Sequence, residues 1–265
     1  MTVYAQDSFD LRLEWGRDGV TALGPHCAVL VVVDVLVFTT TVDIALSRGG
    51  RVLPLPWRDE RAVEAARAAG AVLTRGGLAG IEGGRSAGTT LVADAAVGEW
   101  TLRPSSLVTL PEGAFLAISS PNGATLCAAA AATGTTVLAG CLRNASAVAA
   151  AAVELAGDAP IGIVAAGERW RDTPDRRLRP GIEELLGAGA IAAAVTGRRA
   201  PSAEARLAAL TYRAAAGRVG ELVAESVSGR ELVAAGVPAD VVLASDVDVS
   251  RVVPVLVDGV FEDRR

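Results

Sequence analysis

The chain of 265 residues is long enough to bury a sizeable core, and its length lies within the range of a single α/β domain. Hydrophobic residues make up 51% of the chain but aromatic residues only 4%, so the core has to be built from Val, Leu, Ile and Ala. The net charge of −5 and the scattered basic residues argue against a nucleic-acid-binding surface, which requires a basic stripe.

The counts of lysine, histidine and cysteine exclude several further kinds of active site. No lysine is present, since all 25 basic residues are arginine, and this excludes a Schiff-base lysine and a phosphate-loop lysine. The only histidine, His26, follows Gly-Pro and is predicted to be a structural loop residue. The cysteines Cys27, Cys127 and Cys141 are widely spaced and form no metal-binding pattern, which favours a reducing cytoplasm.

Neither a signal peptide nor a membrane span is predicted. Charged residues interrupt the first fifteen positions. The uncharged stretch 113–142 is broken by Ser119-Ser120-Pro121-Asn122-Gly123, a turn that a membrane helix would not tolerate.

Short β-branched runs alternate with Ala-rich segments of helical length along the chain. Strands are predicted at residues 10–14, 27–35, 51–55, 71–74, 114–119, 136–139, 161–165, 241–244 and 252–257. Helices are predicted at residues 39–48, 60–69, 122–132, 144–155, 182–194, 203–215, 218–225 and 229–235. Residues 75–103 and 167–180 are predicted to be loops.

This alternation predicts a three-layer α/β/α fold around a mainly parallel, or mixed, central sheet. No repeat, heptad run or linker divides the chain, so residues 1–265 are predicted to form one domain.

Polar side chains recur where the predicted strands end. They are Asp34, then Ser119, Ser120 and Asn122, then Arg143 and Asn144, and finally Glu168 and Arg169. In an open parallel sheet these positions are carboxyl ends, and ligands bind in the crevice outside those ends. The four junctions are therefore expected to converge on one site.

Asp34 directly follows the apolar run Val29-Leu30-Val31-Val32-Val33. A carboxylate there is costly to bury unless it binds a cation, faces solvent or caps the next helix. Hard oxygen ligands suit Mg²⁺, which takes one or two carboxylates together with substrate phosphate. Asp34 is thus a candidate metal ligand, and a role as phospho-accepting nucleophile is equally open.

Two further segments offer groups for an anion. Ser119 to Gly123 forms a turn that leads into a helix N-terminus, where backbone N–H groups favour negative charge. Arg179 can hold a phosphate or sulfonate with two hydrogen bonds. Glu183 and Glu184 follow in the first turn of a helix, and because adjacent helical residues point about 100° apart, one of the two is expected to face the site.

Two patterns imitate other functions. Asp246-Val247-Asp248-Val249-Ser250 is similar to the start of an aspartyl-phosphate phosphatase motif, but that motif belongs after the first strand. The glycines between positions 76 and 88 lack the GxGxxG spacing of a dinucleotide site.

Several stretches together resemble the 2-phosphosulfolactate phosphatase family, in particular its actinobacterial-type branch. They are Val31-Val32-Val33-Asp34-Val35-Leu36, Phe38-Thr39-Thr40, Ser120-Pro121-Asn122-Gly123, Leu142-Arg143-Asn144-Ala145, Ala165-Ala166-Gly167-Glu168-Arg169-Trp170, Leu178-Arg179-Pro180-Gly181-Ile182-Glu183-Glu184-Leu185, Gly187-Ala188-Gly189-Ala190, Ser228-Gly229-Arg230-Glu231-Leu232 and Val253-Pro254-Val255-Leu256. The resemblance implies an α/β/α fold and Mg²⁺-dependent release of phosphate from 2-phosphosulfolactate. The site residues that it implies are Asp34, Asn122, Arg143, Asn144, Glu168, Arg169 and Glu183.

The sequence thus predicts a phosphoric monoester hydrolase that acts on a small anionic phosphoester. Asp34, Glu183 and Glu184 are the candidate Mg²⁺ ligands, and Asp34, Arg143, Glu168 and Arg169 the candidate catalytic residues. Substrate binding is assigned to Ser119, Ser120, Asn122, Gly123, Asn144 and Arg179. A non-catalytic binder of phosphorylated or sulfonated metabolites and a nucleotide-dependent α/β enzyme are the alternatives. A cytoplasmic homodimer is the expected form of the protein.

Overall fold

The structure is a computed structural model that describes residues 3–75, 97–170 and 173–265. The part up to α4 contains β1 (Leu11–Trp15), α1 (Gly16–Leu23), β2 (Val29–Val33), α2 (Phe38–Ser47), β3 (Arg51–Leu55), α3 (Glu60–Ala69), β4 (Val72–Arg75), β5 (Val97–Thr101), β6 (Phe115–Ser119) and α4 (Gly123–Ala131). It is followed by β7 (Thr136–Gly140), α5 (Ala145–Ala156), β8 (Ile161–Ala165), β9 (Glu168–Arg169), β10 (Leu178–Arg179), α6 (Ile182–Val195), α7 (Ala203–Ala214), α8 (Val219–Glu225), α9 (Val227–Ala234), α10 (Pro238–Ser245), β11 (Pro254–Val257) and β12 (Val260–Asp263). Short 3-10 turns lie at η1 (Val3–Ala5), η2 (Gly24–His26) and η4 (Pro104–Leu107).

The described strands form a ten-stranded mixed sheet in the order β1-β8-β2-β7-β11-β12-β3-β6-β4-β5, and β9 and β10 form a separate hairpin. The strands β1, β8, β2 and β7 are mutually parallel, and so are β3, β6, β4 and β5. Three antiparallel pairings, β7 with β11, β11 with β12 and β12 with β3, join these two halves. The halves therefore run in opposite directions along the sheet.

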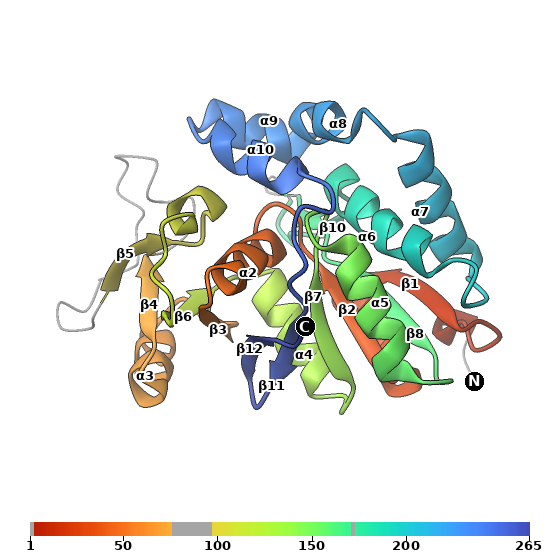
Figure 1. Ribbon diagram of the computed structural model, residues 1–265, viewed down its shortest axis with the longest axis horizontal. Coiled ribbons are helices and arrows are strands. Elements are labelled where there is room, and N and C mark those ends of the chain that lie inside the picture. Colours follow the sequence, from red (N-terminus) through yellow and green to blue (C-terminus); the bar gives the residue numbers. More distant parts are fainter. Residues whose placement is uncertain (1–2, 76–96, 171–172) are drawn as a thin grey trace.

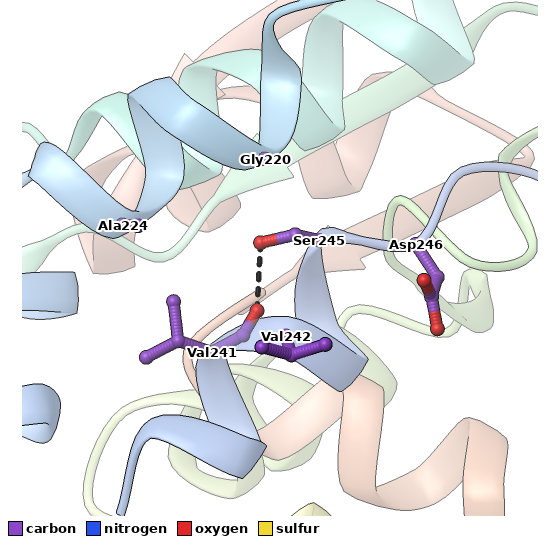
Figure 2. A pocket seen from close by; sticks show the side chains of 6 residues that line it. All are labelled: Gly220, Ala224, Val241, Val242, Ser245 and Asp246. Atoms are coloured by element: carbon purple, nitrogen blue, oxygen red, sulfur yellow. Dashed lines mark hydrogen bonds between the residues drawn. The ribbon is translucent and has the colours of Figure 1, made fainter.

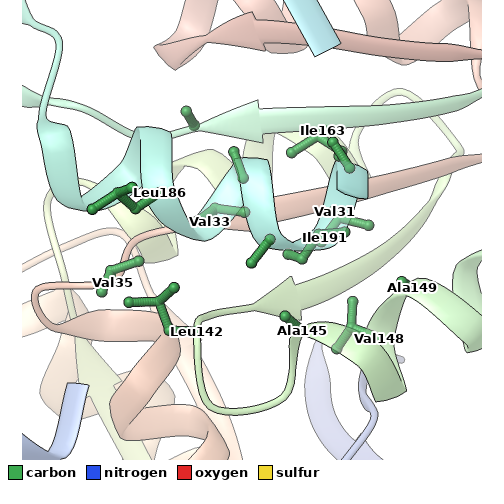
Figure 3. Packing of buried hydrophobic residues seen from close by; sticks show 14 of the residues in the cluster. Val31, Val33, Val35, Leu142, Ala145, Val148, Ala149, Ile163, Leu186 and Ile191 are labelled. Atoms are coloured by element: carbon green, nitrogen blue, oxygen red, sulfur yellow. The ribbon is translucent and has the colours of Figure 1, made fainter. Parts of the chain in front are cut away.

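Strand β2 lies in the middle of the first half and is buried on both faces. Val31 and Val33 face the layer of α5, α6 and α7, whereas Leu30 and Val32 face α1, α2 and α4. Figure 3 shows the first of these contacts, with β2 packed against Leu186 and Ile191 of α6. Burial on both faces explains the unbroken apolar run, because each strand face needs its own hydrophobic side chains.

The arrangement confirms the predicted three-layer α/β/α fold with a mainly parallel, mixed sheet (Figure 1). Helices α8, α9 and α10 form a further group that packs together at one end of the molecule (Figure 1). None of the described helices combines the length and apolar character needed to cross a bilayer.

Several predicted elements differ from the structure. Residues 241–244 lie in helix α10 and not in a strand, because Pro238 begins the helix and the buried Asp240 near its start pairs with Arg103 (2.8 Å). The predicted loop 167–180 contains the hairpin β9–β10, and β5 lies within the predicted loop 75–103, of which residues 76–96 fall outside the described part. Helix α1 and strand β12 were not predicted, because the first is short and the second is partly polar.

Candidate active site

Asp34 lies just beyond the end of β2, where it is 5% exposed. Its Oδ2 accepts a hydrogen bond from the Gly123 backbone N–H (2.9 Å), and its Oδ1 accepts one from the Phe38 N–H (3.3 Å). The carboxylate is therefore held between the first turns of α4 and α2, where N–H groups stabilise an anion. Burial nevertheless raises the pKa of Asp34 to about 6, and the charge of Glu183 adds to this rise.

Glu183 and Glu184 occupy the first turn of α6 and are also buried. Both oxygens of Glu183 and Oε2 of Glu184 have no hydrogen-bond partner among the described residues. A Cβ atom at Gly181 would overlap Glu184 Oε2 and come within 2.9 Å of Glu183 Oε1, so both carboxylates gather at the helix cap. Both carboxylates thus reach the same point although adjacent helical residues point about 100° apart, and the expectation that one of them faces the site stays a prediction.

These three side chains, Asp34, Glu183 and Glu184, are called the carboxylate cluster below. Burial raises the pKa of Glu184 well above its usual value, and the charges of Glu183, Asp34 and Glu168 add to the rise. Buried like charges with unpaired oxygens are costly unless a cation compensates them. Within the described residues, no group of three or more His, Cys, Asp or Glu has metal-binding geometry. A cation with a small number of carboxylate ligands and further water or substrate ligands fits the donor set best, because Mg²⁺ binds in this way.

The turn before α4 reaches the cluster by an unexpected route. Strand β6 belongs to the half of the sheet that runs opposite to β2, so the two strands do not share a carboxyl edge. Helix α4 instead lies over both halves and packs on β3 as well as on β2 and β7, which brings Gly123 to Asp34. The junctions of Asp34 and Gly123 thus meet because α4 bridges the two halves, and the convergence of all four junctions stays a prediction.

The individual groups of this turn have different surroundings. The Gly123 N–H is used to hold Asp34, and a Cβ there would approach Asp34 Oδ2 to 2.7 Å, so only glycine fits. Asn122 is the N-cap of α4, but its side chain makes no capping hydrogen bond. Ser119 and Ser120 are both buried just before it. Their predicted contacts with substrate stay predictions.

Arg143 follows β7 and is enclosed by partners from distant segments. Its Nε donates to Asp43 Oδ2 (2.8 Å), and its Nη1 donates to Asp246 Oδ2 (3.0 Å) and to the Leu243 carbonyl (3.0 Å). This arrangement, called the Arg143 crossing below, ties β7 to α2 and to the end of α10. Asp43 is fully buried, and burial raises its pKa while Arg143 opposes the rise. The guanidinium therefore has a structural task in addition to the predicted catalytic one.

Asn144 also has a structural task. Its side chain is fully buried, and Oδ1 accepts a hydrogen bond from the Cys141 N–H (2.9 Å) while Nδ2 donates to the Ala139 carbonyl (3.4 Å). These contacts brace the turn between β7 and α5. These hydrogen bonds explain why Asn144 is buried without any substrate, so its contact with substrate stays a prediction.

Glu168, Arg169 and Arg179 lie on the β9–β10 hairpin between β8 and α6. All three are partly buried. The Arg179 guanidinium donates from Nη2 to Ser228 Oγ (3.0 Å), whereas no hydrogen bond or ion pair joins the Arg169 side chain to the described residues. The hairpin ends two residues before Gly181, where the carboxylates of Glu183 and Glu184 gather, so β10 leads directly to the carboxylate cluster.

The acidic residues that hold the Arg143 crossing were not predicted from the sequence. Asp43 is the only charged residue of α2, and an acid in an otherwise apolar and threonine-rich helix was a usable signal. In the segment that imitates a phosphatase motif, Asp246 pairs with Arg143, while Asp248 accepts hydrogen bonds from the Ser146 N–H (2.8 Å) and hydroxyl (2.7 Å). Asp248 thus stabilises the start of α5, which gives this segment a structural role. His26, in turn, lies in η2, with Asp7 3.6 Å from its Nδ1.

Two surface pockets lie outside the carboxylate cluster. The first, of about 300 Å³, is lined by Gly220, Ala224, Val241, Val242, Ser245 and Asp246 between α8 and α10 (Figure 2). The second, of about 440 Å³, is lined by Tyr4, Glu14, Asp18, Gly19, Thr21, Ala22 and His26. The first pocket is mainly apolar, and none of the described residues that line the second has an unpaired buried polar atom. The carboxylate cluster is therefore a better candidate for the active site than either pocket.

Comparison with known families agrees with this site. A family model described as 2-phosphosulpholactate phosphatase matches residues 103–259, which is more than half of the chain. The match spans α4, the Arg143 crossing at β7, the β9–β10 hairpin and α6. Asp34 precedes the matched range, so its place in the site rests on the geometry alone.

Proposed function

From the premise that the chain belongs to the 2-phosphosulpholactate phosphatase family and is a phosphoric monoester hydrolase, we propose that it releases phosphate from 2-phosphosulfolactate in a Mg²⁺-dependent reaction. Water and the ester are converted into sulfolactate and inorganic phosphate, and the bond that breaks joins phosphorus to the ester oxygen. The observation that carries the proposal is the carboxylate cluster, in which three buried oxygens have no hydrogen-bond partner among the residues that the structure describes.

The size of the barrier supports a metal in this reaction. Enzymes that hydrolyse phosphate monoesters lower the barrier by upward of about 20 kcal/mol. A hydrogen bond to a charged group contributes only about 1.5–3 kcal/mol, so a few arginines are not sufficient. When bound, Mg²⁺ would polarise a phosphoryl oxygen and orient water.

The residues that would hold the ion are Asp34 and Glu183, with Glu184 as the third candidate. The N–H groups of Phe38 and Gly123 fix both oxygens of Asp34, which leaves one lone-pair direction on each for a ligand bond. The first turn of α6 presents Glu183 in the same way, without any competing hydrogen bond from the described residues. A carboxylate that two backbone N–H groups hold in one orientation is already suited to bind a metal ion. We therefore favour a role of Asp34 as metal ligand over a role as nucleophile.

Charged and polar groups around the cluster would bind the substrate. Arg143 is proposed to stabilise the equatorial oxygens of the phosphoryl group, with Glu168 as an acid or base. Arg169, the other arginine predicted for this task, projects from the hairpin face opposite to Glu168 and is proposed to act only at the edge of the site. Ser119, Ser120, Asn122, Asn144 and the Gly123 backbone are proposed to line the phosphate side, and Arg179 the far side of the substrate. The proposal treats residues 1–265 as one phosphatase domain. A homodimer is a prediction that sedimentation equilibrium would check.

The direct test is release of inorganic phosphate from 2-phosphosulfolactate by protein stripped with EDTA and then titrated with Mg²⁺. We expect no turnover in EDTA and saturable recovery with Mg²⁺. Turnover that persists in EDTA would reject the metal, and tight binding of the ester without any phosphate release would favour the non-catalytic binder. Thermal stabilisation by NAD or ATP, but not by phosphate with Mg²⁺, would favour a nucleotide-dependent enzyme.

A further inference from the structure

The β9–β10 hairpin sorts its four side chains onto two faces. Glu168 is paired directly with Arg179, and Arg169 is paired directly with Leu178. Residues that lie opposite each other in an antiparallel pair project from the same face, and neighbours along a strand project from opposite faces. Glu168 and Arg179 therefore share one face of the hairpin, and Arg169 shares the other face with Leu178.

The end of β10 leads directly to the carboxylate cluster. Arg179 stands two residues before Gly181, where the carboxylates of Glu183 and Glu184 gather. On the opposite face of the hairpin, Leu178 packs on the chain at Gly16 and Gly167, because its Cδ1 lies 3.2 Å and 2.8 Å from the positions that a Cβ would take there. The side chain of Arg179 thus leaves the hairpin on the face that Leu178 does not use, and Arg169 shares the Leu178 face.

Arg179 is also held in place by a residue from α9. Its Nη2 donates to Ser228 Oγ at 3.0 Å, and Ser228 is only 5% exposed. Ser228 itself is fixed, because the next residue, Gly229, donates its N–H to the N-cap Ser226 Oγ (2.9 Å) and leaves no room for a Cβ against the Val223 carbonyl. A guanidinium has five N–H donors in a planar fork, so the bond to Ser228 leaves the others available.

From this geometry we infer that Ser228 is a positioning residue, which holds Arg179 as the recognition group for a second anionic group, a carboxylate or sulfonate, on the phosphate ester. The inference rests on the proposed phosphatase function and assigns part of its substrate selectivity. A planar, oriented guanidinium binds such a group with two hydrogen bonds, whereas a mobile one has to be ordered first at an entropic cost. Arg169 does not take part in this recognition.

The test compares Ser228→Ala with wild type in steady-state kinetics on 2-phosphosulfolactate, together with inhibition by inorganic phosphate. We expect Ser228→Ala to raise KM about tenfold with kcat within about twofold. The inhibition constant of inorganic phosphate, which has no second anionic group, should stay the same. Ser228→Thr retains the hydroxyl and should restore KM, and Ser226→Ala should lower the melting temperature by loss of a helix cap without this change in KM.

A second pair of variants separates the two arginines. Arg179→Gln should raise KM for 2-phosphosulfolactate more than Arg169→Gln does, without weakening inhibition by phosphate. The inference is overturned if Ser228→Ala leaves KM unchanged, if it weakens phosphate and ester equally, or if Arg169→Gln has the larger selective effect. If wild type releases no phosphate, the proposed function fails by itself, and calorimetric binding of sulfolactate to wild type and Ser228→Ala then decides whether the recognition site exists.

Discussion

Two buried charged regions of this protein are built in opposite ways. In the Arg143 crossing, one guanidinium lies between Asp43, Asp246 and a backbone carbonyl, so positive and negative charge are matched within the chain. In the carboxylate cluster, the charges that act most strongly on Asp34 and Glu184 are those of other carboxylates. Within the described part of the chain, one oxygen of the crossing, Asp43 Oδ1, has no hydrogen-bond partner, whereas three oxygens of the cluster have none.

The difference distinguishes buried charges that stabilise the fold from buried charges that are available to a ligand. A buried ion pair whose partners are all present can hold segments together, and here it joins β7, α2 and α10, which are far apart in the sequence. Buried carboxylates without a partner among the described residues are costly unless a ligand or a proton compensates their charge. The proposed Mg²⁺ would be such a ligand. Four predictions test this contrast.

The largest effect is expected for the carboxylate cluster. Asp34→Asn and Glu183→Gln should each lower phosphate release by about a thousandfold or more, because a lost Lewis acid costs several kcal/mol of transition-state stabilisation and each factor of ten is about 1.4 kcal/mol. Far-UV circular dichroism should stay unchanged. The matched control is Glu204→Gln, which alters an exposed acid in the first turn of α7 and should retain full activity. Near wild-type, Mg²⁺-dependent activity of Asp34→Asn would refute the assignment.

The next effect concerns the Arg143 crossing. Asp43→Ala should lower the free energy of unfolding by about 3 kcal/mol, because it leaves a mostly buried guanidinium without its buried partner. Urea denaturation measures this loss. Asp246→Ala removes a partner that is 44% exposed and should cost less than about 1 kcal/mol. Equal losses for the two variants would show that burial does not set the strength of the crossing.

The unfolding free energy of EDTA-treated protein should depend on pH through Asp34. Its folded pKa of about 6 lies above the ordinary 3.8, so the folded state binds more protons in this range. The stabilisation is therefore complete below about pH 4 and is lost as pH rises through about 6, by up to about 3 kcal/mol. The raised pKa of Glu184 acts with the same sign.

Denaturant titrations across this pH range measure how the unfolding free energy changes with pH. The unfolding free energy of the Asp34→Asn variant should change less with pH than that of wild type. Saturating Mg²⁺ at neutral pH should recover stability in wild type, because it compensates the ionised cluster. A flat profile between about pH 4 and about pH 6 would contradict the burial of an uncompensated Asp34.

The smallest effect is expected in the segment that imitates a phosphatase motif. Asp248→Ala should cost about 1 kcal/mol, the usual loss for a helix cap, because Asp248 accepts the Ser146 N–H at the start of α5. Phosphate release should be unchanged, since Asp248 does not reach the carboxylate cluster in this arrangement. Loss of turnover in Asp248→Ala without loss of stability would instead give this segment a catalytic role.

Much of the fold followed from local patterns in the sequence. Helix α3 has the predicted bounds, because Asp59 caps it and Gly70 ends it in a left-handed conformation (φ 70°). The apolar run of β2 predicted a strand, which the structure confirms, and the structure shows that both of its faces are buried. Prediction failed at α10, where the β-branched pair Val241-Val242 favoured a strand but the helix is fixed by the ion pair between Asp240 and Arg103.

By itself, then, the sequence determined the α/β/α architecture, the absence of lysine chemistry and the acid at the end of β2, because these depend on residue type and on periodicity along the chain. Only the tertiary structure decided which charges are matched. Asp43 and Asp246 reach Arg143 across about a hundred residues each, and α4, which lies over both halves of the sheet, brings Gly123 to Asp34 although β6 runs against β2. Such pairings depend on the direction and order of strands in space, and local sequence carries almost no information about either.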